Sequence, residues 1–182
     1  MISEEAAPPD IATASSDYKS RFAGPTGEWL LSVQTDTVFH FLSEKSSAEI
    51  RVLEVGGGHG QLTEELLLKG FEVWVHGSTD ETLDPIRELQ ERFPGKLHFV
   101  TSSMYSIPFE SSFFHSVIGL RILAHVKDPE RLLGEWSRLG SKIIFDFPPL
   151  ESFNIFYPAL FRLKKMLEGN TRTFEIYRTQ SL

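Results

Sequence analysis

The chain has no cysteine among its 182 residues. This absence excludes disulfide bonds, thiolate metal sites and a cysteine nucleophile, and it is compatible with a reducing compartment. No uninterrupted apolar run approaches the roughly 20 residues that span a bilayer. The N-terminus also lacks the basic and then apolar pattern of a signal peptide. We therefore expect a cytoplasmic protein without a membrane-spanning segment.

Positive charge is scarce as well. The sequence has 18 Lys and Arg against 25 Asp and Glu, so its net charge is −7. An acidic surface repels phosphate backbones, which disfavours general nucleic-acid binding. The hydrophobic content of 41% allows one domain with a sizeable core. Residues 1–20 are rich in Ala, Pro, Ser and acids and are predicted to be a flexible arm, which leaves residues 21–182 as the domain.

Short β-branched runs alternate with helical patterns along this domain. The expected strands cover residues 50–55, 71–75, 96–100, 114–119 and 141–146. The expected helices begin near Gly27, Gly60, Thr79 or Asp80, and Asp128-Pro129. In the first helix, Leu30, Val33, Val38 and Phe41 share one face. The alternation predicts an α/β fold: a Rossmann-like, doubly wound, mostly parallel sheet in three layers, with its ligand crevice at the carboxyl ends of the strands.

A glycine run, Gly56-Gly57-Gly58-His59-Gly60, follows the first expected strand directly. Glycine permits positive φ and close approach of a ligand, and the next helix points free amide groups into the same gap. These amides suit a carboxylate, and Glu54 suits an ammonium, so together they match the amino-acid end of S-adenosylmethionine. A dinucleotide fingerprint would need its third glycine at Gln61. A glycine turn without a ligand is the third interpretation.

Three segments resemble motifs of the class I S-adenosylmethionine-dependent methyltransferases of the type 11 kind. Residues 52–60, VLEVGGGHG, resemble the first motif V-L-D/E-x-G-x-G-x-G. Ile107-Pro108-Phe109 with residues 112–118 looks like L-P-F…S-F-D-x-V, and residues 122–130 are similar to V-L-x-H-V-x-D-P-E. The resemblance covers about residues 50–148. It implies S-adenosylmethionine as cofactor and methyl transfer to a small-molecule acceptor, with no nucleic-acid partner and no metal.

The resemblance also implies which residues contact the cofactor. They are Glu54, Gly56, Gly57, Gly58, Gly60, Gly77, Ser78, Ser103, Met104 and Leu120. Relatives often carry acids where Gly77 and Ser103 stand here. This departure favours an alternative, a degenerate methyltransferase-like cofactor-binding protein with a regulatory or scaffolding role. His125 is the candidate base, and Arg121 is the candidate for binding an acidic substrate.

The end of the chain departs from the family pattern too. The family sheet usually has two more strands after the fifth, and residues 171–182 are too few for both, so we expect these strands to be missing or shortened. An exposed fifth strand would invite a homodimer through the sheet edge. Residues 151–168 are predicted to form a helix that packs on the core, covers the substrate as a lid or touches a membrane surface. Stable membrane insertion is not expected.

Overall fold

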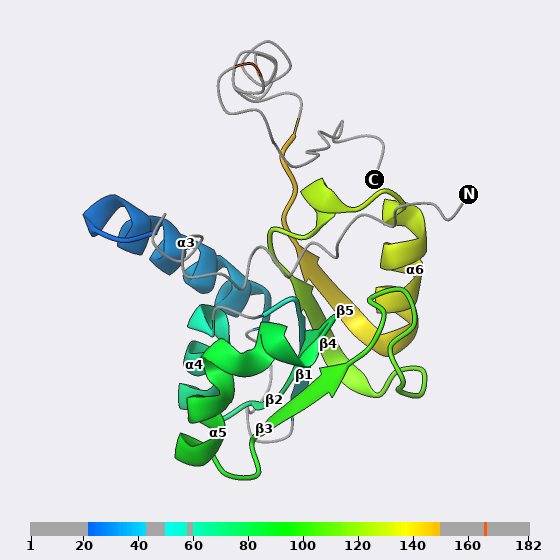
Figure 1. Cartoon of the computed structure of the whole chain (residues 1–182), viewed down its shortest axis with the longest axis horizontal. Coiled ribbons are helices and arrows are strands. Elements are labelled where there is room, and N and C mark those ends of the chain that lie inside the picture. The colour runs from blue at the N-terminus through cyan, green and yellow to red at the C-terminus, as the bar shows by residue number, and fades with distance from the viewer. Residues whose placement is uncertain (1–21, 43–49, 58–59, 150–165, 167–182) are drawn as a thin grey trace.

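The computed structural model describes residues 22–42, 50–57, 60–149 and 166. Within these residues the sheet has five strands, all flanked by helices (Figure 1). The strands are β1 (Arg51–Val55), β2 (Glu72–Gly77), β3 (Leu97–Thr101), β4 (Phe114–Gly119) and β5 (Gly140–Phe145). The described α-helices are α3 (Pro25–Leu42), α4 (Gln61–Leu68), α5 (Arg87–Arg92) and α6 (Pro129–Leu139). The 3₁₀ segment η2 (Asp80–Ile86) precedes α5, and η3 (Leu123–His125) precedes α6.

The strand order is β3-β2-β1-β4-β5, and every neighbouring pair is parallel. In the central register, Glu54 of β1 lies between Val75 of β2 and Ile118 of β4. The chain direction across the sheet reverses between β1 and β4, so the crevice of this fold lies at the carboxyl end of β1. The predicted doubly wound parallel sheet is confirmed, with strand ends within two residues of the expected ones.

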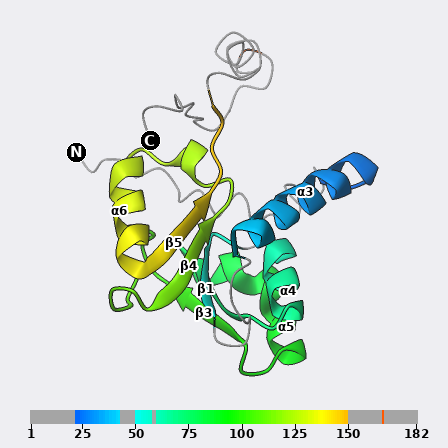
Figure 2. The same ribbon diagram turned by 180° about the vertical axis from the view of Figure 1, so that it is seen from behind.

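Helices cover both faces of the sheet, as the three-layer prediction requires. In Figures 1 and 2, α3, α4 and α5 lie on one face and α6 lies on the other. The first face is filled by aliphatic side chains such as Leu66 of α4 and Leu83 of η2. The second is filled by a cluster that includes the fully buried side chains of Trp136 on α6, Leu53 on β1 and Phe114 on β4. These two apolar layers hold the carboxyl ends of β1 and β4 in fixed relation.

Helix α3 corrects one detail of the sequence pattern. Leu30, Val33 and Phe41 share a face with Val38 in sequence, yet they are 50%, 41% and 54% exposed, whereas Val38 is 1% exposed. The first half of the helix projects beyond the sheet (Figure 1), which leaves Leu30 and Val33 exposed. Phe41 lies in the last turn but points away from the core, where Val38 and Leu42 are the buried side chains. Apolar spacing therefore predicted the helix but not its inward face.

Two of the predicted helix starts, at Asp128 and at Thr79 or Asp80, behave differently. Asp128 caps α6 as expected, because its carboxylate accepts the Arg131 backbone N–H at 3.0 Å. Thr79 makes no side-chain cap hydrogen bond, and the segment after it is a 3₁₀ helix. Pro85 lies inside that segment and has no backbone N–H, so regular α-helix begins only at Arg87.

Several predictions fall outside the described residues: the arm at 1–20, the helix at 151–168 except for Met166, the shortened C-terminal strands, and Gly58 of the glycine loop. They stay predictions. Across the part of the chain that the structure describes, no helix is long and apolar enough to cross a membrane.

Candidate cofactor site

A pocket opens at the carboxyl ends of β1 and β4, beside the glycine loop. It brings together five of the residues singled out from sequence, namely Glu54, Gly56, Gly57, Leu120 and Arg121. Helix α3 and the start of α4 close its other sides. The remaining lining residues are Leu31, Gln34, Thr35, Val55, Gln61 and Leu62. The crevice expected at the switch point of the sheet is therefore present.

The first and last residues of the glycine loop have the backbone that the sequence pattern predicted. Gly56 and Gly60 have φ values of 69° and 68°, in the left-handed region that favours glycine. Gly60 precedes α4 as its N-cap, and its amide donates to the Gly57 carbonyl at 3.0 Å. A Cβ atom on Gly57 would lie 2.7 Å from the Cδ atom of Glu54. Gly57 must therefore lack a side chain for the Glu54 carboxyl to occupy its place under the loop.

Glu54 is the charged centre of the pocket. Glu54 is 7% exposed, and its carboxylate accepts a hydrogen bond of 2.6 Å from the Thr63 hydroxyl on α4. Burial raises the pKa of Glu54 from 4.5 to about 7, although the Thr63 bond and the nearby positive charge of Arg121 oppose the shift. A carboxyl held in this state gains most from a cationic ligand that favours its ionised form.

A second carboxyl, Asp146, ties three elements together next to the pocket residues Gln34 and Arg121. One of its oxygens accepts the backbone N–H of Arg121, after β4, and the other accepts the Gln34 side-chain amide of α3 at 3.1 Å. Asp146 itself follows β5. Burial raises its pKa, while the Arg121 amide and guanidinium lower it. The Arg121 guanidinium also lies 4.7 Å from the centre of the Phe22 ring.

The groups present fit the methionine end of S-adenosylmethionine. Glu54 is a buried carboxyl suited to an ammonium, and the start of α4 supplies backbone amides suited to a carboxylate. The side-chain oxygen of Gln61, at the first turn of α4, is buried and has no hydrogen-bond partner among the described residues. It is a further acceptor for a donor group of a ligand.

The other predicted cofactor residues do not line this pocket. Gly77 ends β2 and packs against η2, where a Cβ atom would lie 2.2 Å from the Thr82 hydroxyl oxygen. Packing against η2 is therefore sufficient by itself to require glycine at this position. Ser78 follows it, half-buried, and is likewise outside the pocket lining. Met104 is 6% exposed and belongs to the second apolar layer.

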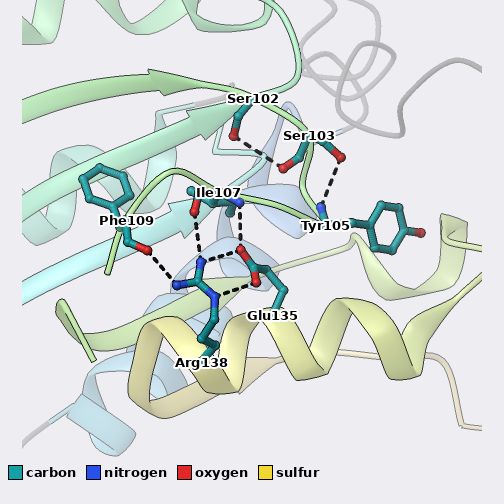
Figure 3. Close-up of polar contacts among 7 residues, drawn as sticks. All are labelled: Ser102, Ser103, Tyr105, Ile107, Phe109, Glu135 and Arg138. Atoms are coloured by element: carbon teal, nitrogen blue, oxygen red, sulfur yellow. Dashed lines mark hydrogen bonds and ion pairs between the residues drawn. The ribbon is translucent and has the colours of Figure 1, made fainter. Parts of the chain in front are cut away.

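Ser103 lies in the connection between β3 and β4, which α6 holds in place (Figure 3). Arg138 donates to the carbonyls of Phe109 and Ile107 at 2.6 and 3.0 Å and also pairs with Glu135. Glu135 in turn accepts the Ile107 backbone N–H at 2.7 Å. The motif Ile107-Pro108-Phe109 is thus fastened by two α6 side chains. This anchorage fixes the connection that carries Ser103 and Met104 beyond the end of β3.

His125, the candidate base, ends the 3₁₀ segment η3 and is half-buried. It is not among the residues that line the pocket. Its backbone amide donates to the Ile122 carbonyl at 2.9 Å, which makes it part of the turn before α6. A catalytic role for His125 stays a prediction. In the described residues, no group of three His, Cys, Asp or Glu side chains is placed to hold a metal ion.

Sequence reasoning missed Gln34, Thr63 and Asp146. Thr63 and Glu54 are nine residues apart, and Gln34 and Asp146 are 112 apart, so neither pair has a local spacing that marks it. One signal was available on α3: Leu31, Gln34 and Thr35, which all line the pocket, have the i, i+3, i+4 spacing of one helix face.

Comparison with solved structures supports the fold. The magnesium protoporphyrin IX methyltransferase of Synechocystis, solved with bound SAH, has a TM-score of 0.68 and 16% identity, over 94% of this chain and 82% of its own. A Bacillus halodurans protein provisionally classed as a methyltransferase has a TM-score of 0.63 and 19% identity, over 80% of this chain. This chain spans only 63% of that protein's length.

The same fold does not determine the reaction. The [4+2]-cyclase SpnF has a TM-score of 0.52 and 17% identity, over 59% of this chain and 40% of its own. No curated protein matches the sequence at a significant level. Residues 53–142 do match a family model, described as a methyltransferase domain, and this range contains Glu54, the glycine loop and Arg121. Residues 53–142 therefore belong to this methyltransferase-domain family, and the fold is the class I fold that the motifs predict.

Proposed function

We propose that the protein transfers a methyl group from S-adenosylmethionine to a small-molecule acceptor. The observation that carries the proposal is the pairing of a buried carboxyl, Glu54, with a glycine loop shaped around it, at the crevice of a methyltransferase fold. The cofactor supplies a methyl group on a positive sulfonium, which is a good leaving group. The chain must mainly align the acceptor and exclude water.

Each part of the pocket has a proposed task. Glu54 holds the cofactor's ammonium, and the amides at the start of α4 hold its carboxylate. Leu120 lies against the cofactor from the end of β4. The adenosine end extends toward the carboxyl ends of β2 and β3, where Gly77, Ser78, Ser103 and Met104 lie. With no acid at Gly77 or Ser103, serine hydroxyls and backbone amides supply the hydrogen bonds there.

The acidic composition supports a small-molecule acceptor rather than a nucleic acid. The lack of any cysteine supports the cytoplasm as the location of this activity. We propose residues 21–182 as the methyltransferase unit and 1–20 as its arm. A homodimer through the edge at β5, the last strand of the described sheet, is the oligomer we propose to test by light scattering.

Cofactor binding is tested by a pair of glycine variants. Gly57→Ala places a Cβ 2.7 Å from Glu54 Cδ and should weaken S-adenosylmethionine binding at least tenfold in calorimetric titration. Gly134→Ala is the matched control, because a Cβ at this exposed position of α6 meets nothing within 4 Å. It should bind the cofactor as the wild type does. Equal affinity of both variants would show that the loop is not the site.

Turnover separates the enzyme from the alternative cofactor-binding role. Purified protein with S-adenosylmethionine and a mixture of small-molecule acceptors should form S-adenosylhomocysteine (SAH), detected by mass spectrometry. Tight cofactor binding with no SAH formed from any acceptor would favour the regulatory or scaffolding role. No binding at millimolar cofactor would contradict both.

A further inference from the structure

Arg121 has a singular position in the pocket. Among the described residues that line it, Arg121 is the only Lys or Arg. It lies two residues beyond β4, next to Leu120, on the side of the pocket that α3 closes through Gln34. The Nη1 atom of its guanidinium is buried, and its positive charge acts on Glu54.

The backbone of Arg121 is held in an unusual state. Its φ is 61°, and Ser112 is the only other non-glycine residue with positive φ in the part of the chain that the structure describes. A left-handed arginine costs about 1 kcal/mol or more and persists only where neighbours hold it. Here the Asp146 carboxylate holds the Arg121 amide, and Gln34 holds Asp146. Three elements thus cooperate to present one side chain.

The Arg121 guanidinium is placed for recognition of an anion. It stacks near the Phe22 ring at 4.7 Å, and a guanidinium over an aromatic ring still has N–H groups along its edges. Those edges match the two oxygens of a carboxylate. Lysine, with a compact ammonium, would supply the charge without this planar fork.

The charges of the pocket favour the same ligand class. Glu54 lines the pocket, Asp146 holds the Arg121 backbone from outside the lining, and both carboxyl groups feel the positive charge of Arg121. Bound S-adenosylmethionine adds an ammonium, a carboxylate and a sulfonium, so the cofactor and these three side chains together are close to neutral. The positive charges nearest the acceptor would be Arg121 and the sulfonium, which attract an anionic acceptor and repel a cationic one.

We propose that Arg121 determines acceptor specificity by binding a carboxylate or similar oxyanion of the methyl acceptor. This inference rests on the proposed function, since it assigns the acceptor class of the same pocket. Asp146 and Gln34 are then positioning residues that act through Arg121. The competing roles for Arg121 are to hold the cofactor's own carboxylate or only to neutralise Glu54.

The test uses matched acid and amide probes on the full chain saturated with SAH. The pairs are 4-hydroxybenzoate with 4-hydroxybenzamide, and octanoate with octanamide, and their dissociation constants are measured by ligand-observed NMR. Wild type should bind at least one acid about tenfold more tightly than its amide, equivalent to about 1.4 kcal/mol. Arg121→Gln should abolish this preference, and Arg121→Lys should keep part of it. SAH affinity should fall by a smaller factor than acid affinity in both variants, because Arg121 also favours the ionised form of Glu54.

A second variant guards against misfolding. Arg121→Asn removes the charge with a residue that tolerates left-handed φ, so it should fold even if Arg121→Gln does not. The proposal is overturned if wild type binds neither acid or shows no preference for it, or if Arg121→Asn keeps the preference. It is also overturned if losing Arg121 weakens SAH as much as the acid, which would assign Arg121 to the cofactor. Failure of wild type to bind SAH would instead contradict the proposed function.

Discussion

Glu54→Gln tests the electrostatic account of the pocket most directly. Glutamine keeps the shape of the side chain and an oxygen that can accept from Thr63, but it cannot titrate. In the folded chain the pKa of Glu54 is about 7, against an ordinary value of 4.5. The folded chain therefore keeps the Glu54 proton to higher pH than the unfolded chain does. Wild-type stability from this group is greatest at low pH and is lost as pH rises from about 4.5 to about 7.

The size of the loss follows from the two pKa values. Each pKa unit corresponds to about 1.4 kcal/mol, so the full shift corresponds to about 3 kcal/mol above pH 7. Between pH 5 and pH 8 the wild type should lose about 2 to 3 kcal/mol relative to Glu54→Gln. Comparing the two proteins at two pH values cancels the contributions to the free energy of unfolding from groups that titrate in both. It also cancels any constant packing cost of the glutamine.

Urea denaturation at pH 5 and pH 8 measures this double difference. Parallel pH profiles of the two proteins would refute the reasoning, because they would show that Glu54 is not buried as a titrating group. The cofactor supplies a second readout. Its ammonium favours ionised Glu54, so affinity should rise with pH up to about 7 in wild type and be weaker and flat in Glu54→Gln.

Three further substitutions probe the frame around the site. Gly119→Ala places a Cβ 2.0 Å from the Trp136 ring and should lower the free energy of unfolding by about 1 to 3 kcal/mol in urea; an unchanged midpoint would contradict this packing. Asp128→Ala removes the cap of α6 and should cost about 0.5 to 2 kcal/mol, by the same measurement. The Arg138 hydrogen bond lowers the pKa of Glu135, so ionised Glu135 stabilises the fold above pH 4.5 and this stability is lost as pH falls. Glu135→Gln should therefore be less stable than wild type at pH 7 and approach it at pH 3, and a constant difference would refute the coupling.

The sequence predicted the parts of the site that lie on one short segment. A β-branched run followed by glycines indicates a strand, a left-handed turn and a helix start, and the structure has all three in order. Glu54 is the last strand residue but one, so its place beside the loop follows from chain connectivity. The resemblance of three separate motifs then added the fold and the cofactor, which local patterns alone do not determine.

The parts that sequence could not predict depend on contacts between distant segments. The hydrogen bond from the Gln34 amide to the Asp146 carboxylate joins α3 to the end of β5, and no sequence pattern near either residue indicates this contact. Gly77 shows the opposite limit. Its place in the motif suggested a cofactor contact, whereas a Cβ there would collide with Thr82, so a packing constraint alone already requires the glycine. Motif position does not separate these two causes.

Gly57 raises the same question for the glycine loop, and Glu54 supplies the answer. If the loop were only a turn, the only effect of having glycine at position 57 would be to make room for the buried Glu54 carboxyl, whose burial costs stability. Turns do not require such a carboxyl, and an apolar residue at position 54 would remove the cost. The combination is favourable only when a cation reaches Glu54 and stabilises its charge. Strain of this kind, imposed by one residue and accommodated by another, is expected where a ligand binds, and it favours a cationic ligand over a bare turn.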